Sequence, residues 1–240
     1  MPIHKQQQNR QVIKDNPGGN MKSVLIVDDD RVLRKLIVRA MEKASDHLKI
    51  FEAEDGQMAI DILGSEDIGV VVTDINMPRV NGLMLIAYMN AFYPDVPCFV
   101  MTAYGTSRMK SKMPYDLLKF YHKPLDAHEL AAAVVTALES DRVPDERQTI
   151  SLANFLDMVI LEELTCTVTV EAEGMDPCHL FIDNGVLLDA AMGEHRGEAV
   201  ALDALSRPGV NFSMENGCPE TIQRRINRPL GELIENPPDR

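Results

Sequence analysis

The sequence lacks the features that mark membrane, secreted and metal-thiolate proteins. No apolar run approaches the roughly 20 residues that span a bilayer, and the first twenty residues hold no apolar stretch suited to a signal peptide. The cysteines show neither C-x-x-C pairing nor metal-ligand spacing; they are Cys98, Cys166, Cys178 and Cys218. These absences predict a cytoplasmic protein with no membrane partner and with reduced, unpaired thiols.

Lysine is absent from the stretch between Asp145 and Arg240. The 18 acidic and 7 basic residues of this stretch give it a net charge of −11, against −5 for the 18 acidic and 13 basic residues of 22–141. The whole chain has a net charge of −13. An acidic surface repels a phosphate backbone, so we expect no nucleic-acid partner.

The length of 240 residues suits two domains of ordinary size. The predicted organisation is a flexible polar tail at 1–21, a first domain at 22–141, a polar linker at 142–147 and a second domain at 148–240. The ordered pattern opens at Met21, which is an alternative start that one sequence does not decide.

The first domain alternates short apolar strands with segments of helical spacing. Five such strands indicate a doubly wound α/β fold with a flavodoxin-like (βα)5 parallel sheet, in the order 2-1-3-4-5. The expected strands are 24–27, 50–53, 70–73, 98–101 and 119–122, and the expected helices are 30–44, 57–63, 83–91 and 126–140.

The second domain has a different rhythm and is predicted to be a smaller α+β unit. A hairpin is expected around the turn Asp183-Asn184-Gly185, because an Asn-Gly pair favours a tight turn. The other expected elements are helices at 151–164, 198–205 and 222–234, and strands at 166–170 and 211–214.

Polar side chains follow four of the strands expected in the first domain. Asp28 and Asp29 follow the first strand, Asp74 the third, Thr102 the fourth and Lys123 the fifth. In a doubly wound sheet these strand ends share one edge, and a ligand binds in the crevice there. Three carboxylates in one crevice repel one another unless a cation lies between them, and oxygen ligands suit Mg²⁺.

A carboxylate nucleophile, a divalent ion and a lysine make a phosphoryl-transfer site. Lys123 is placed to pair with Asp74, and Thr102 offers a hydroxyl to a phosphoryl oxygen. The alternative is that acids after a strand cap the next helix, and Asp30 is expected to do only that. Capping does not explain acids on two strands facing a lysine.

Four strings in this order resemble the receiver domains of two-component response regulators: LIVDDD at 25–30, VVVTDINMPRVNG at 70–82, FVMTAYG at 99–105 and FYHKP at 120–124. The resemblance implies that Asp74 accepts a phosphoryl group from a histidine kinase or phosphotransfer protein, with Mg²⁺ held by Asp28, Asp29 and Asp74.

The resemblance also implies further roles. Asn76 gives its backbone carbonyl to Mg²⁺, Thr102 and Lys123 hold the phosphoryl group, and Phe120 changes rotamer when that group arrives. For Phe120 the alternative is a core aromatic residue. The peptide bond before Pro124 is expected to be cis.

The sequence departs from the family at two places. Pro114 breaks a helix interior, so the fourth helix is expected to be short or distorted, which leaves the route of the output signal open. Asn81 stands where an aspartate is frequent, in a loop expected to lie outside the pocket.

In the second domain, the string LFIDNGVLLDAAMGEHRGEAVALDALSRPGVNFSM at 180–214 resembles the PATAN-type module. This resemblance implies protein–protein interaction and carries no residue roles. The prediction is therefore a response regulator that is not an enzyme, beyond its own phosphorylation and dephosphorylation, and that signals through a protein partner of the second domain.

The sequence leaves two alternatives to this prediction. A DNA-binding transcriptional response regulator needs a basic recognition helix, whereas the basic cluster Arg224, Arg225 and Arg228 is expected on a solvated or partner-facing side of the last helix. The second alternative is an enzyme, either a C-terminal hydrolase or a phosphatase that uses Asp74 as its nucleophile. Phosphatases of the haloacid dehalogenase type place a second acid two residues after the nucleophile, where this chain has Asn76.

Overall fold

The computed structural model describes residues 21–103, 118–139, 150–172, 174, 176–207 and 210–235. The predicted tail (apart from residue 21), the predicted linker at 142–147 and the Pro114 region lie outside these residues.

The first sheet is parallel, and its strands run in the order β2-β1-β3-β4-β5, which confirms the predicted topology. Because β1 lies between β2 and β3, its end is beside the end of β3, with Val27 opposite Thr73. The strands are β1 (Lys22–Val27), β2 (Leu48–Ala53), β3 (Val70–Asp74), β4 (Cys98–Thr102) and β5 (Leu118–His122).

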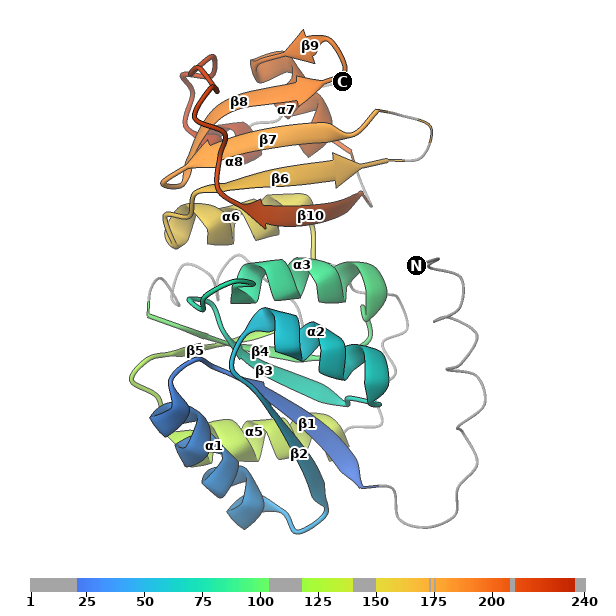
Figure 1. Ribbon diagram of the computed structural model, residues 1–240, viewed down its shortest axis with the longest axis vertical. Helices are drawn as coiled ribbons and strands as arrows, with labels where there is room; N and C mark the ends of the chain where they lie inside the picture. The colour runs from blue at the N-terminus through green and yellow to red at the C-terminus, as the bar shows by residue number, and fades with distance from the viewer. Residues whose placement is uncertain are drawn as a thin grey trace.

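Helices cover both faces of this sheet (Figure 1). Alternate residues of β1 point to opposite faces, so Val24 and Ile26 pack with α1 and α5, while Leu25 and Val27 join the cluster that holds α2 and α3. Covered on both sides, β3 is buried at every residue. The helices are α1 (Arg31–Ala44), α2 (Gly56–Ser65), α3 (Gly82–Phe92) and α5 (Ala127–Glu139).

The second sheet is antiparallel, in the order β10-β6-β7-β8-β9. The Asn-Gly hairpin is confirmed, with φ of 49° at Asn184 and 73° at Gly185. The elements are α6 (Leu152–Leu161), β6 (Cys166–Glu171), β7 (Cys178–Asp183), β8 (Val186–Met192), β9 (His195–Arg196), α7 (Glu198–Leu205), β10 (Asn211–Asn216) and α8 (Leu230–Glu235).

The helix predicted at 222–234 is wrong over its first half. The structure is helical only from Leu230, directly after Pro229, whose ring disfavours helical backbone in the residue before it. The preceding segment instead runs along β8, where the amides of Arg225 and Ile226 both donate to the carbonyl of Leu188, at 2.8 and 3.0 Å. This segment therefore covers β8 at Leu188.

The basic cluster consequently does not lie on the last helix. Arg225 Nε lies 3.5 Å from Asp189, and Arg228 Nη1 lies 3.0 Å from Glu198. Arg224 Nε donates to a backbone carbonyl, that of Ile226, at 3.1 Å. All three guanidinium groups are used within the second domain.

The helix α3 is covered on two sides. One side faces the parallel sheet, and the other faces β10 and α6 of the second domain (Figure 1). Its buried residues therefore surround the helix axis, as expected for a helix buried all round; they are Gly82, Leu83, Leu85, Ile86, Ala87 and Met89. One hydrophobic cluster runs through α3 from one domain into the other.

Candidate functional site

Three carboxylates meet at the carboxyl ends of β1 and β3. Asp28 and Asp74 are buried and Asp29 is exposed, and one oxygen of each lies within 4.8 Å of the others. The backbone amide of Asp30 donates to Asp28 Oδ1 at 2.8 Å, which orients that carboxylate. The donor set is oxygen alone, as Mg²⁺ prefers, so these residues suit a divalent cation.

Lys123 reaches this cluster from the end of β5. Its Nζ lies 2.9 Å from Asp74 Oδ1 and 3.0 Å from Asp28 Oδ2. Its backbone amide donates to the carbonyl of Thr102 at 2.8 Å, and the Lys123–Pro124 peptide bond is cis, as predicted. The contact with Asp74 agrees with the prediction, whereas no feature of the sequence indicates that Lys123 bridges two acids.

The ionisation of this cluster reflects its burial. Burial raises the pKa of Asp74 to about 6, although its hydrogen bond to Lys123 acts in the opposite direction. Burial lowers the pKa of Lys123, but its pairing with Asp74 and Asp28 outweighs that effect and raises it. Lys123 therefore stays positively charged between the two acids, and Asp74 takes up a proton more readily than an exposed aspartate.

Asp30 confirms the capping role predicted for it. Its carboxylate accepts hydrogen bonds from the amides of Val32 at 2.8 Å and Leu33 at 3.2 Å, at the start of α1. Asp30 is absent from the three-acid cluster.

Thr102 ends β4 and is buried beside the cluster. Its hydroxyl donates to Oε1 of Glu162, a residue of the second domain. The side-chain amide of Asn76 donates to Oε2 of the same carboxylate at 3.1 Å. Thr102, predicted to hold the phosphoryl group, and Asn76, predicted to bind the metal, thus also contact the second domain.

Glu162 was not identified from the sequence. It caps the carboxyl end of α6 and is buried. The helix dipole disfavours a carboxylate at this end of a helix. The pair Glu162-Glu163 is therefore the feature of the sequence that indicates a stabilising partner for one of these carboxylates.

The loop between β3 and α3 makes further contacts with the second domain. Asn216, at the end of β10, accepts a hydrogen bond from the side-chain amide of Asn81 at 3.1 Å and donates one to the carbonyl of Arg79 at 2.8 Å. Asn81 also caps α3 by accepting from the amide of Met84 at 2.9 Å. Asn81 lies outside the acidic cluster, as expected, but its contact with the second domain was not predicted.

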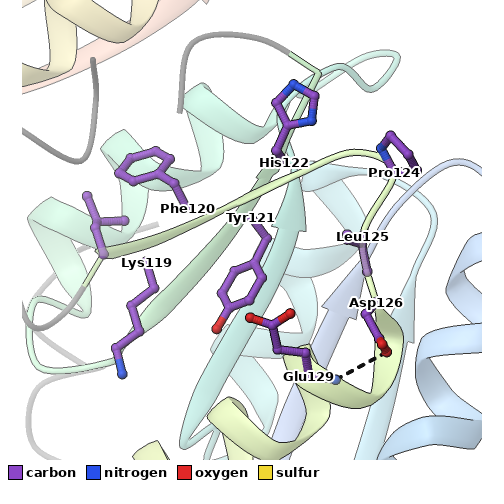
Figure 2. Close-up of a pocket in the computed structure, with 9 residues that line it drawn as sticks. Lys119, Phe120, Tyr121, His122, Pro124, Leu125, Asp126 and Glu129 are labelled. Atoms are coloured by element: carbon purple, nitrogen blue, oxygen red, sulfur yellow. Dashed lines mark hydrogen bonds between the residues drawn. The ribbon is translucent and has the colours of Figure 1, made fainter. Parts of the chain in front are cut away.

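Phe120 lies on β5 and is 5% exposed. Figure 2 shows Phe120 and Tyr121 on opposite sides of the strand, beside a hollow of about 440 Å³ lined by β5 and the start of α5. The acids Asp28, Asp29 and Asp74 do not line this hollow. Phe120 is thus a core aromatic residue, and its predicted change of rotamer remains a prediction.

No described helix is long and apolar enough to cross a membrane. Burial raises the pKa of Cys98 and of Cys166 to about 12 and that of Cys178 to about 11, so these thiols stay protonated near neutral pH.

Comparison with known proteins identifies the first domain. Residues 24–135 match the family model described as response regulator receiver domain. The chain is 30% identical over 126 residues to the transcriptional regulatory protein GlrR of Escherichia coli (strain K12), a match covering 52% of this chain and 28% of that protein. It is 30% identical over 119 residues to a protein-glutamate methylesterase/protein-glutamine glutaminase of Azospirillum brasilense, covering 48% of this chain and 30% of that protein.

A longer match is to the response regulator MprA of Mycobacterium sp. (strain KMS), 30% identical over 147 residues, which covers 61% of this chain and 62% of that protein. The chain spans less than two thirds of the length of each of these three relatives. The match is thus to a part of each relative, and the names of the first two give different activities, transcriptional regulation and methylesterase/glutaminase activity.

Proposed function

We propose, from the response regulator receiver domain that residues 24–135 form, that this chain takes up a phosphoryl group on Asp74 in a two-component system and passes the signal on through a protein contact of its second domain. The observation that carries this proposal is the position of Asp74, whose carboxylate is grouped with Asp28 and Asp29 and lies 2.9 Å from Lys123 Nζ.

The acids and Lys123 have separate parts in this proposal. Asp28, Asp29 and Asp74, with the backbone carbonyl of Asn76, hold Mg²⁺, which when bound offsets the negative charge that builds up as a phosphoryl group approaches. An oxygen of Asp74 attacks phosphorus while the bond from phosphorus to the histidine nitrogen of the donor breaks. Lys123 then pairs with a phosphoryl oxygen.

Thr102 and Phe120 report the new group. Thr102 ends the strand beside β3, and in this proposal its hydroxyl donates to a phosphoryl oxygen on Asp74. Phe120 then follows the movement of Thr102, because β5 pairs with β4. In this proposal, phosphorylation of Asp74 therefore changes the conformation of β5.

We propose a PATAN-type interaction module as the second domain, with a protein partner and no nucleic-acid partner. The second domain has a net charge of −10 over residues 148–240, which supports this choice. Its described arginines also leave little positive charge for DNA, because four of them pair with acids of the same domain and the fifth, Arg224, bonds a backbone carbonyl; the pairs are Arg196–Asp189, Arg225–Asp189, Arg207–Asp203 and Arg228–Glu198.

The second candidate is a DNA-binding transcriptional regulator. It is favoured by the names of relatives such as GlrR, whose matched part is 28% of that protein. The match to the protein-glutamate methylesterase covers 30% of that protein. An enzymatic output of the kind in its name would therefore lie outside the matched part.

The test of the proposed function is phosphorylation of the full chain by acetyl phosphate, followed by electrophoresis in a phosphate-binding gel. We expect a shifted band that requires Mg²⁺, disappears with EDTA and is absent from Asp74→Asn. The matched control is Asp95→Asn, which changes an exposed aspartate of the same domain and should leave the shift intact. A shift that persists in Asp74→Asn would refute the assignment.

A further inference from the structure

The second domain places a carboxylate directly on the phosphorylation site. Glu162 is 8% exposed, and both of its oxygens are bonded to receiver residues, Oε1 by the hydroxyl of Thr102 and Oε2 by the side-chain amide of Asn76. Asn76 lies two residues after Asp74, and Thr102 ends the strand that pairs with β3. The carboxylate thus bonds two residues that flank Asp74.

Thr102 cannot serve Glu162 and a phosphoryl group equally. A threonine hydroxyl carries one hydrogen and therefore donates one strong hydrogen bond at a time. When it donates to a phosphoryl oxygen on Asp74, Glu162 Oε1 loses that donor while remaining buried, and an unsatisfied buried carboxylate is unfavourable.

Charge acts in the same direction. The phosphoryl group brings negative charge to a site that already holds three aspartates, and like charges close together in a buried site repel strongly. Glu162 is relieved of both penalties if it leaves Thr102 and returns to solvent, which requires the carboxyl end of α6 to move.

The surrounding contacts connect such a movement to the whole interface. The β3–α3 loop that carries Asn76 is also bonded to Asn216 through Asn81 and through the carbonyl of Arg79. At the other end of α3, Asn90 Oδ1 accepts from the amide of Ile150, just before α6, at 2.7 Å. The loop after the phosphoacceptor is therefore itself part of the docking surface.

We propose that Glu162 is a further residue of the phosphorylation site, supplied by the second domain, and that it competes with the phosphoryl group on Asp74 for the hydroxyl of Thr102. Docking of the second domain and phosphorylation of Asp74 then oppose each other. Because coupling between two equilibria is reciprocal, docking weakens occupancy of the site by the same factor by which occupancy weakens docking. This inference rests on the proposed function of Asp74.

The first test compares Glu162→Gln with Glu163→Gln in the full chain. Both remove one charge from the end of α6, but Glu163 is exposed and makes no described contact with Thr102 or Asn76. A neutral glutamine accepts the hydroxyl more weakly than a carboxylate does and repels a phosphoryl group less. We expect acetyl phosphate to phosphorylate Glu162→Gln roughly fivefold faster or more than the wild-type chain, and Glu163→Gln at the wild-type rate.

The second test uses the unmodified chain and therefore does not depend on whether a variant folds. Hydrogen exchange is followed by mass spectrometry with Mg²⁺, with and without beryllofluoride as the phosphoryl analogue. We expect beryllofluoride to increase exchange in peptides from the end of α6 and from β10, while strands β6 and β7 stay protected.

The outcomes separate the two proposals. If neither the wild-type chain nor Glu162→Gln is phosphorylated, the proposed function fails. If both are phosphorylated at Asp74 at equal rates, or if Glu162→Gln is slower, Glu162 does not compete and this inference fails alone. Unchanged exchange at α6 and β10 on addition of beryllofluoride would likewise overturn it.

Discussion

The backbone carbonyl oxygen of Asp74 lies so close to Gly82 that a Cβ added to Gly82 would stand 2.0 Å from it. The amide of Gly82 also donates to the carbonyl of Ile75 at 2.8 Å, so α3 begins in direct contact with the phosphoacceptor. A side chain at this position would push the first turn of α3 and the end of β3 apart, because two backbone segments have little room to yield.

We therefore expect Gly82→Ala to destabilise the protein by about 1–3 kcal/mol or more and to slow phosphorylation of Asp74. The control is Gly231→Ala in α8, where an added Cβ meets nothing within 4 Å and alanine favours the helix. Urea unfolding and the gel-shift assay would be run on both. Equal stability of the two variants would contradict the close approach at Gly82.

Lys123→Ala should bind Mg²⁺ at least as tightly as the wild-type chain. Lys123 holds oxygens of both Asp28 and Asp74, so removing it takes a competing cation away from two expected metal ligands. Thr102→Ala, which loses no expected metal ligand, should also keep its affinity. Both variants should fail to propagate the signal. Calorimetric titration with Mg²⁺ measures the affinity, and its loss in either folded variant would refute this division of roles.

The affinity for Mg²⁺ should fall as the pH falls through about 6. Burial raises the pKa of Asp74 to about 6, so below that pH a proton increasingly occupies the carboxylate and competes with the metal. The loss should approach tenfold for each pH unit well below the pKa, since one proton is displaced. Titrations at pH 7.5, 6 and 5 would show it. Asp74→Asn should bind more weakly throughout and lack this component of the pH dependence.

Asn216→Ala should weaken docking of the second domain without disturbing the acidic cluster. It removes two hydrogen bonds to the β3–α3 loop, worth about 1 kcal/mol each, and in this proposal it should raise the rate of phosphorylation. Ser213→Ala changes an exposed residue of the same strand and serves as the control. Phosphorylation rates unchanged in Asn216→Ala would show that this contact does not restrain Glu162.

The full chain should not bind DNA. Six arginines against 16 acids in the second domain leave few cations to displace counterions from a phosphate backbone, and the described arginines already have partners. Fluorescence anisotropy with mixed duplexes at low salt is the sensitive measurement, made with and without beryllofluoride. Micromolar binding that weakens steeply with added salt would restore the transcriptional alternative.

The sequence by itself determined the features that depend on neighbouring residues. Acids directly after apolar strands located Asp28, Asp29 and Asp74, because parallel strands bring their carboxyl ends to one edge of the sheet. The capping role of Asp30 and the turn at Asn184-Gly185 also followed from local backbone chemistry. The predicted last helix begins too early, because Pro229 disfavours helical backbone in the residue before it.

Tertiary structure alone decided how the two domains meet. Glu162 and Thr102 are 60 residues apart, and Asn81 and Asn216 are 135 apart. No periodicity connects such positions, because their pairing depends on how α3 packs between the two domains. The sequence contains two unusual local features: the acidic Glu162 at the end of α6, and apolar residues around the whole circumference of α3. Only the packed structure shows that the first is bonded to Thr102 and that the second is covered by β10 and α6.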